Sequence, residues 1–146
     1  MALILLVEDN ELNRDMLSRR LLRRGYQLRY ADCGAAALRE VEAELPDLIL
    51  MDIGLPDIDG WEVTQRLKAS PKTASIPVIA LTARAFASDE ARSLSVGCAF
   101  HETKPVRLGA LLAKMNSLLS ARGVEVPNVR GASVGGAAQR PQGEVE

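Results

Sequence analysis

Apolar and polar residues follow two patterns that alternate five times along the chain. Short and nearly continuous apolar runs predict strands, and the longer segments between them repeat apolar residues every three or four positions, which predicts helices. The strands are predicted at residues 3–7, 27–31, 48–51, 78–81 and 98–102. The first, third and fourth runs are almost entirely apolar, so we expect them at the centre of a parallel sheet.

The helices are predicted at residues 11–24 and 34–44, from residue 59 onward, from about residue 88 to residue 96, and at residues 106–120. Gly25 is expected to end the first helix, and Asp59 to cap the third. The residues expected to face the core are Leu12, Met16, Leu17 and Leu21 in the first helix, Leu38, Val41 and Leu45 in the second, Val63 and Leu67 in the third, and Leu108, Leu111, Leu112, Met115, Leu118 and Leu119 in the last.

This alternation of strands and helices with short loops predicts an α/β fold, a doubly wound parallel sheet of five strands built from right-handed βαβ units. Residues 1–120 carry the pattern and are expected to form one domain. After residue 120 the composition shifts to Gly, Ala, Pro, Gln and Val without any period. We expect residues 121–146 to be a disordered tail, because they cannot bury enough apolar surface to offset the entropy of ordering them.

Composition excludes several classes of protein. The net charge of −1 provides no basic surface for nucleic acid, and the apolar runs are too short to span a membrane. The N-terminus has no basic segment before its apolar run, so it does not predict a signal peptide. Cys33 and Cys98 are isolated, which favours a reduced, cytoplasmic setting. His101 is the single histidine, and there is no Cys/His cluster for zinc.

Polar residues that can carry chemistry follow four of the five predicted strands. Glu8 and Asp9 follow the first strand, Asp52 the third and Thr82 the fourth, and the fifth leads to Lys104. Ligands of open α/β sheets bind outside the carboxyl ends of the strands, so we expect these side chains to meet there. Two carboxylates about 4 Å apart repel by roughly 4 kcal/mol at an effective dielectric constant near 20, so a set of three requires a cation or shifted pKa values. Such an all-oxygen set suits Mg²⁺.

These residues lie within the stretches "LLVEDN", "DLILMDIGLPDIDG", "IPVIALTA" and "TKP". In this order and spacing they resemble the response regulator receiver family of bacterial two-component signalling. The resemblance covers residues 3 to about 119, nearly the whole predicted domain. It implies the flavodoxin-like (βα)5 fold with strand order 2-1-3-4-5.

The resemblance also assigns roles to the residues at the strand ends. It implies that Asp52 is the phosphoacceptor, a nucleophile that forms an acyl phosphate. It implies that Glu8 and Asp9 form the acidic pair that holds Mg²⁺, directly or through water. The backbone carbonyl of Gly54 is implied to be a further ligand of the metal, together with Asp52.

Further residues are assigned by the same resemblance. Thr82 is expected to bond a phosphoryl oxygen and Lys104 to pair with another, and the Lys104–Pro105 peptide bond is expected to be cis. His101 occupies a position where the family usually has Tyr or Phe as a rotating switch. A half-exposed histidine without a signalling role remains an alternative. Because Gly54 has no side chain, Arg84 could lie over the phosphoryl site.

The resemblance implies partners as well. A histidine kinase or a histidine phosphotransfer protein would donate the phosphoryl group. A downstream effector protein would bind the surface made by the fourth helix, the fifth strand and the fifth helix. No output domain follows the predicted receiver, so the chain is expected to be either a stand-alone receiver or a fragment of a larger hybrid kinase.

Other interpretations remain open. Asp9 and Asn10 could cap the first helix, and Asp57 and Asp59 are expected to be turn or cap residues. A haloacid-dehalogenase-like phosphatase would need a second Asp at position 54, which is Gly. Flavin or nucleotide binding would need a Gly- or Ser/Thr-rich loop after the first strand, where "VEDNELN" is acidic. A receiver that binds partners without phosphorylation would not need the complete set of acids, threonine and lysine.

Overall fold

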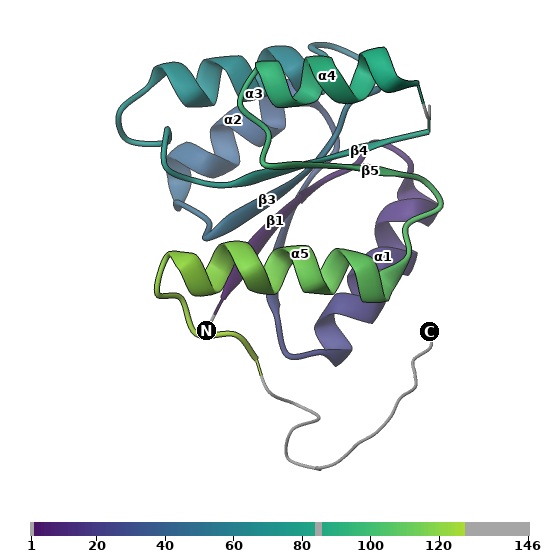
Figure 1. Cartoon of the computed structure of the whole chain (residues 1–146), viewed down its shortest axis with the longest axis vertical. Coiled ribbons are helices and arrows are strands. Elements are labelled where there is room, and N and C mark those ends of the chain that lie inside the picture. The colour runs from purple at the N-terminus through teal and green to yellow at the C-terminus, as the bar shows by residue number, and fades with distance from the viewer. Residues whose placement is uncertain (1, 84–85, 128–146) are drawn as a thin grey trace.

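A parallel sheet with helices on both faces makes up the computed structural model, which describes residues 2–83 and 86–127 (Figure 1). The strands are β1 (Leu3–Val7), β2 (Gln27–Ala31), β3 (Leu48–Asp52), β4 (Val78–Thr82) and β5 (Phe100–Thr103). The helices are α1 (Glu11–Arg23), α2 (Gly34–Ala43), α3 (Gly60–Ala69), α4 (Ala87–Ser95) and α5 (Leu108–Ala121). The strand order is β2-β1-β3-β4-β5 and all neighbours are parallel, which confirms the predicted flavodoxin-like fold.

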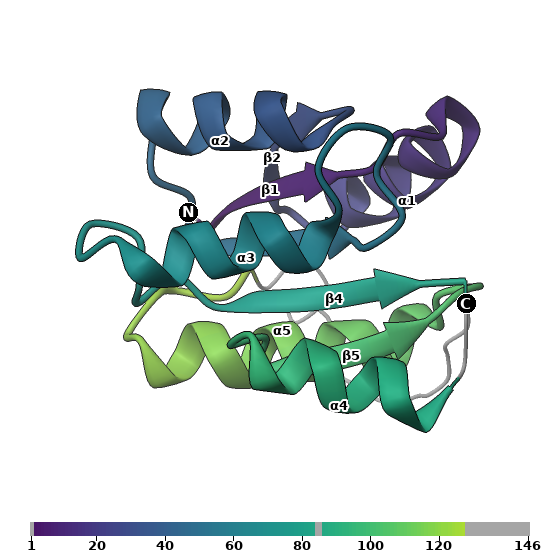
Figure 2. The same ribbon diagram turned by 90° about the horizontal axis from the view of Figure 1, so that it is seen from above.

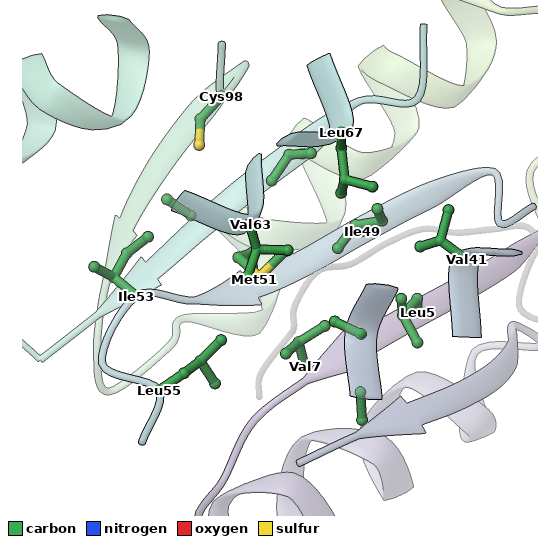
Figure 3. Packing of buried hydrophobic residues seen from close by; sticks show 14 of the residues in the cluster. Leu5, Val7, Val41, Ile49, Met51, Ile53, Leu55, Val63, Leu67 and Cys98 are labelled. Atoms are coloured by element: carbon green, nitrogen blue, oxygen red, sulfur yellow. The ribbon is translucent and has the colours of Figure 1, made fainter. Parts of the chain in front are cut away.

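The three central strands are apolar on both sides of the sheet. Alternate residues of a strand point to opposite faces, so a strand covered on both faces is apolar along its length, and β3 and β4 become polar only at their last residues, Asp52 and Thr82. In β1, Leu5 and Val7 join the cluster under α2 and α3, whereas Ile4 and Leu6 join the cluster under α1 and α5. Figure 3 shows the first cluster, in which Val63 of α3 packs over the sheet. Figures 1 and 2 show α1 and α5 on one face and α2, α3 and α4 on the other.

Three of the apolar side chains expected in the core lie at the surface instead. Leu12 is 66% exposed and Met16 is 47% exposed, although Leu21 in the same helix is fully buried. Leu12 and Leu17 are five positions apart and therefore differ by about 140° around the helix, too far for one face to bury both. Leu45 is 53% exposed, since α2 ends at Ala43 and the helical period no longer applies to it.

The last helix agrees with its predicted period, and the chain after it stays in contact with the domain. Leu108, Leu111, Met115 and Leu119 are buried. Ala121, the first residue of the predicted tail, ends α5, and the following segment packs Val124 and Val126 against the core. Residues 128–146 lie outside the described residues. Among the helices that the structure describes, none has the length and hydropathy needed to cross a bilayer.

Local side chains set the helix boundaries near the strand ends. Asn10 caps α1 by accepting a hydrogen bond from the Asn13 N–H at 2.8 Å. Asp59 caps α3 in the same way through the Glu62 N–H at 2.9 Å, as the sequence predicts. After α1, Gly25 has a φ of 93°, a left-handed conformation that favours glycine. The side chains of Asn10 and Asp59 thus fix where α1 and α3 begin after the loops that follow β1 and β3.

Candidate functional site

The polar residues that follow the strands meet at the carboxyl edge of the sheet. Asp52 is the last residue of β3 and Thr82 the last residue of β4, while Glu8 follows β1 directly. All three are buried, with exposed fractions of 4% for Glu8, 4% for Asp52 and 5% for Thr82. The strands are parallel and in register, so their ends lie side by side, and the Lys104 N–H donates to the Thr82 carbonyl at 2.6 Å.

Three carboxylates gather at this edge. One carboxylate oxygen each from Glu8, Asp9 and Asp52 lies within 4.8 Å of the other two. Burial, followed by the negative charge of Glu8, raises the pKa of Asp52 from its ordinary value of 3.8 to about 6. The positive charge of Lys104 opposes this rise. Without a metal ion, the surroundings of the Asp52 carboxylate therefore disfavour its negative charge.

Lys104 connects two of these carboxylates. Its Nζ donates to Glu8 Oε1 at 2.7 Å and lies 3.4 Å from Asp52 Oδ1. Burial alone would lower the pKa of the Lys104 ammonium, but the hydrogen bond to Glu8 and the charges of Asp52 and Glu8 outweigh burial and raise it. Lys104 is thus a fixed positive charge beside Asp52.

Backbone groups hold the carboxylates in place. The Gly54 N–H donates to Asp52 Oδ1 at 3.1 Å, and the Asn10 N–H donates to Glu8 Oε2 at 3.2 Å. Arg14 of α1 donates from Nη1 to the carbonyl of Glu8 at 2.8 Å. No pattern in the sequence assigns Arg14 to the site. Its position one turn into the helix that follows Glu8 is the signal that could have indicated it.

The donor set suits a hard divalent cation. Carboxylate and carbonyl oxygens are the ligands that Mg²⁺ prefers in proteins, and it retains several waters when it binds. The acidic cluster of Glu8, Asp9 and Asp52 could hold such an ion. A Cβ added at Gly54 would lie 4.0 Å from Asp52 Oδ1, so glycine leaves this side of the carboxylate uncovered.

Pro105, Arg84 and His101 are the remaining candidate residues from the sequence. The Lys104–Pro105 peptide bond is cis, the isomer that the resemblance implies. Arg84 lies outside the described residues. His101 of β5 does not join the acidic cluster, because its Nδ1 lies 2.8 Å from Ser93 Oγ on α4.

The bond between Ser93 and His101 belongs to a buried polar chain. Ser93 is fully buried, and its Oγ also accepts from Trp61 Nε1 of α3 at 2.9 Å. Since Ser93 accepts from Trp61, its own hydroxyl proton is available to Nδ1 of a neutral His101. Burial lowers the pKa of His101, as does Lys114 of α5 less strongly, whereas Glu90 and Asp89 of α4 raise it. These two hydrogen bonds therefore link α3, α4 and β5 through the Ser93 hydroxyl.

We expect Ser93→Ala to lower the free energy of unfolding by about 1–3 kcal/mol, because it removes the acceptor of the buried Trp61 Nε1. Urea unfolding followed by the fluorescence of Trp61 measures the change. Ser95→Ala is the matched control, since the Ser95 hydroxyl is exposed and donates to the Arg92 carbonyl of its own helix. Equal losses in the two variants would contradict a role for the buried chain.

The raised pKa of Asp52 predicts how stability depends on pH in the absence of metal. The pKa of Asp52 is about 6 in the folded protein, above its ordinary value of 3.8. The stability that the folded protein gains from protonated Asp52 is therefore fully present below pH 3.8 and is lost as the pH rises through 6. Asp52→Asn, which remains neutral, should be more stable than the parent protein at pH 7 by about 3 kcal/mol. Chemical unfolding in EDTA at pH 4 and pH 7 tests this. A difference between the two proteins that does not grow with pH would contradict it.

Comparison with known proteins gives consistent results. The family model of the response regulator receiver domain matches residues 4–116. The polar-differentiation response regulator DivK of Brucella ovis is 39% identical over 116 residues, which are 80% of this chain and 94% of DivK. Most of the described fold lies within both of these matches.

Two crystal structures resemble the whole fold. The signal receiver domain of a signal transduction histidine kinase from Syntrophus aciditrophicus has 35% identity and a TM-score of 0.77, covering 83% of this chain and 92% of that one. The receiver domain of the sensor histidine kinase PA1611 from Pseudomonas aeruginosa has 33% identity and a TM-score of 0.76, covering 82% of this chain and 98% of that one. The latter holds a magnesium ion coordinated in its active-site cleft.

Proposed function

Because this chain belongs to the response regulator receiver family, we propose that it is a phosphorylation switch whose phosphoacceptor is Asp52. Receiver domains of two-component systems are signalling switches and generally not enzymes. The observation that carries the proposal is the cluster at the carboxyl edge of the sheet, where three carboxylates lie within 4.8 Å and Lys104 bonds one of them and approaches another. We place the protein in the cytoplasm, as the phosphoryl donors proposed below require.

Asp52 is the nucleophile in this proposal. A carboxylate oxygen of Asp52 attacks the phosphorus of a phosphohistidine, the P–N bond breaks, and the electron pair returns to the imidazole of the donor. The product is an acyl phosphate on Asp52. The rigid β3 strand and the Gly54 N–H hold the carboxylate in one orientation before the reaction, which lowers the entropy cost of reaching the transition state.

Lys104 and Thr82 supply the interactions with the transferred group. Lys104 already lies beside Asp52 in the unphosphorylated protein, so its charge neutralises the phosphoryl oxygens without a large rearrangement. The Thr82 hydroxyl is proposed to bond another phosphoryl oxygen, because β4 ends beside Asp52. The same groups are proposed to stabilise the acyl phosphate until it hydrolyses.

Glu8, Asp9, Asp52 and the Gly54 carbonyl are the groups proposed to hold Mg²⁺. When bound, the ion supplies positive charge that offsets the repulsion among these carboxylates and the phosphoryl oxygens. Glu8 is longer than the Asp commonly found at its position, and it already bonds Lys104 and the Asn10 N–H. We therefore propose that Glu8 contacts the metal through water.

The donor is proposed to be a histidine kinase or a histidine phosphotransfer protein that docks beside α1. A depression of about 430 Å³ lies between α1 and the segment after β5, and it is lined in part by Met16, Pro105 and Val106. Met16 is 47% exposed, and Leu12 lies one turn before it on the same helix. Lys104 also lines this depression, so an apolar contact there would bring a donor imidazole close to Asp52.

Output is proposed to pass through the surface of α4, β5 and α5. Phosphorylation adds charge beside Thr82, and His101 lies on β5, whose last residue is the register partner of Thr82. A shift of His101 would change its bond to Ser93 and thereby the position of α4. Such a local charge event biases a two-state element, and a separate effector protein would read the result. The same mechanism applies if the chain is a receiver segment of a larger hybrid kinase.

Incubation of the purified protein with acetyl phosphate tests the proposal. With Mg²⁺ present, intact mass measurement should show the addition of one phosphoryl group, and EDTA should prevent it. An unchanged mass under both conditions, with a folded protein, would contradict the proposal and favour a receiver that acts without phosphorylation. Hydrolysis of a small phosphate ester in many turnovers would instead indicate a phosphatase.

A further inference from the structure

Asp57, in the loop of residues 53–59 between β3 and α3, bonds a distant helix. Its Oδ1 accepts from the Gly34 N–H at 2.7 Å, and its Oδ2 accepts from the Ala35 N–H at 2.9 Å. Both donors belong to the first turn of α2, where backbone N–H groups have no partner within the helix. The next N–H of this turn, that of Ala36, is accepted by Cys33 Sγ at 3.4 Å. One carboxylate thus satisfies two N–H groups of α2 from another loop.

The charge of Asp57 suits this position. Hydrogen bonds from the backbone N–H groups of Ala35, Gly34 and Ile58 hold the pKa of this carboxyl well below its ordinary value. A negative charge at a helix N-terminus also interacts favourably with the helix dipole. The carboxylate is therefore ionised at neutral pH. Its two oxygens accept from two N–H groups at the start of α2, and its negative charge suits the positive end of the helix dipole.

Close packing reinforces the same contact. A Cβ added at Gly34 would lie 2.8 Å from the carbonyl oxygen of Ile58 and 3.0 Å from Val63 Cγ2. Real Cβ atoms essentially never come this close to a backbone oxygen, so only glycine allows this approach. The first turn of α2 and the loop after β3 therefore touch directly, next to the bonds that Asp57 makes (Figure 2).

The other end of this loop holds the proposed phosphoacceptor. The Gly54 N–H donates to Asp52 Oδ1 at 3.1 Å, and the Gly60 N–H donates to the Ile53 carbonyl at 3.0 Å. A Cβ at Gly60 would lie 2.5 Å from the Asp52 carbonyl oxygen, so the loop closes tightly on the end of β3. A displacement of the loop would move the Gly54 N–H that orients the Asp52 carboxylate.

We propose that Asp57 is a positioning residue for the phosphoryl-accepting site. Asp57 holds the loop of residues 53–59 against α2, and this contact keeps Asp52 and Gly54 in the orientation that binds the metal and the phosphoryl group. The inference rests on the proposed function. It assigns α2 a role in the site although no residue of α2 belongs to the acidic cluster. Coupling between two sites is reciprocal, so occupation of the metal site should in turn stabilise the first turn of α2.

Magnesium affinity provides the first test, with magnesium chloride as the only ligand and amide chemical shifts as the signal. Asp57→Ala should weaken Mg²⁺ binding about 10-fold, the effect typical of residues that orient metal ligands. Asp57→Asn retains one acceptor oxygen and should give a smaller loss. It also carries the test if Asp57→Ala does not fold. Gly34→Ala should weaken binding as well, since it separates the helix from the loop on the other side of the contact.

Two control variants separate positioning from simple helix capping. Asp59→Ala removes a cap from the same loop but from α3, and Cys33→Ala removes a cap from α2 that does not involve the loop. Both should lower the free energy of unfolding, yet each should leave the Mg²⁺ affinity of the folded protein within about twofold of the parent value. If Asp57 acted only as a cap, its variants would behave like these controls.

Amide hydrogen exchange provides the second test, independent of phosphorylation. Mg²⁺ should slow exchange at Gly34 and Ala35 in the parent protein and in Asp59→Ala, but not in Asp57→Ala. The inference would be overturned if Asp57→Ala bound Mg²⁺ as tightly as the parent protein, or if Mg²⁺ did not change exchange at Gly34 and Ala35 in the parent protein. Either result would leave Asp52 as the phosphoacceptor. Failure of the parent protein to bind Mg²⁺ at all would overturn the proposed function and this inference together.

Discussion

Asp52→Asn is expected to abolish the transfer of a phosphoryl group from acetyl phosphate. An amide cannot form the acyl phosphate, and the other carboxylates of the cluster lack the position at the end of β3 beside both Lys104 and the Gly54 N–H. Intact mass should therefore remain that of the unmodified variant. The variant should also be at least as stable as the parent protein at pH 7, because it removes a buried charge, so loss of labelling cannot reflect unfolding.

Asp59→Asn is the matched control for this variant. Asp59 lies seven residues further along the same connection, and its side chain caps α3 instead of facing the acidic cluster. It should be labelled to the same extent as the parent protein. Labelling retained in Asp52→Asn, or lost equally in both variants, would contradict the assignment of the phosphoacceptor.

Asp9→Asn should slow Mg²⁺-dependent phosphorylation by about 100-fold, because it weakens the charge stabilisation that the metal site provides to the transferring group. Asp9 is the exposed member of the cluster, whereas Glu8 is buried and bonded to Lys104. Its replacement therefore disturbs the metal site with the least effect on packing. The rate is followed by the increase of phosphorylated mass over time at fixed acetyl phosphate and Mg²⁺.

Glu11→Gln controls for the loss of a negative charge near the site. Glu11 is an exposed residue in the first turn of α1 and is outside the metal cluster. The Glu11→Gln protein should be phosphorylated at the parent rate. Mg²⁺ should raise its melting temperature as it does for the parent protein, since a ligand that binds only the folded state stabilises that state. An Asp9→Asn protein that responds to Mg²⁺ like the parent would show that the ion binds elsewhere or is not needed.

The fold and the positions of the acids could be predicted because both follow from local patterns. Nearly continuous apolar strands that alternate with helices are typical of a parallel sheet covered on both faces, and the carboxyl ends of such strands share one edge. The gathering of Glu8, Asp9, Asp52 and Lys104 therefore follows from where each stands relative to its strand.

Other features depend on contacts between segments far apart in the sequence, which no local pattern contains. From its sequence context Asp57 is expected to be a turn residue, but the partners of its carboxylate lie 22 and 23 residues earlier in the chain. Ser93 looks like one of several polar residues of α4, and only the packing of α3, α4 and β5 makes it an acceptor for Trp61 and a partner of His101.

A crystal structure of the protein with magnesium and beryllium trifluoride, a mimic of the phosphoryl group, tests the central claim most directly. We expect the beryllium to be bonded to a carboxylate oxygen of Asp52, with one metal ion beside it that Asp9 and Asp52 contact, and with Lys104 Nζ bonded to a fluorine. A crystal in which Asp52 carries no adduct while the ion lies away from the ends of β1 and β3 would contradict the claim.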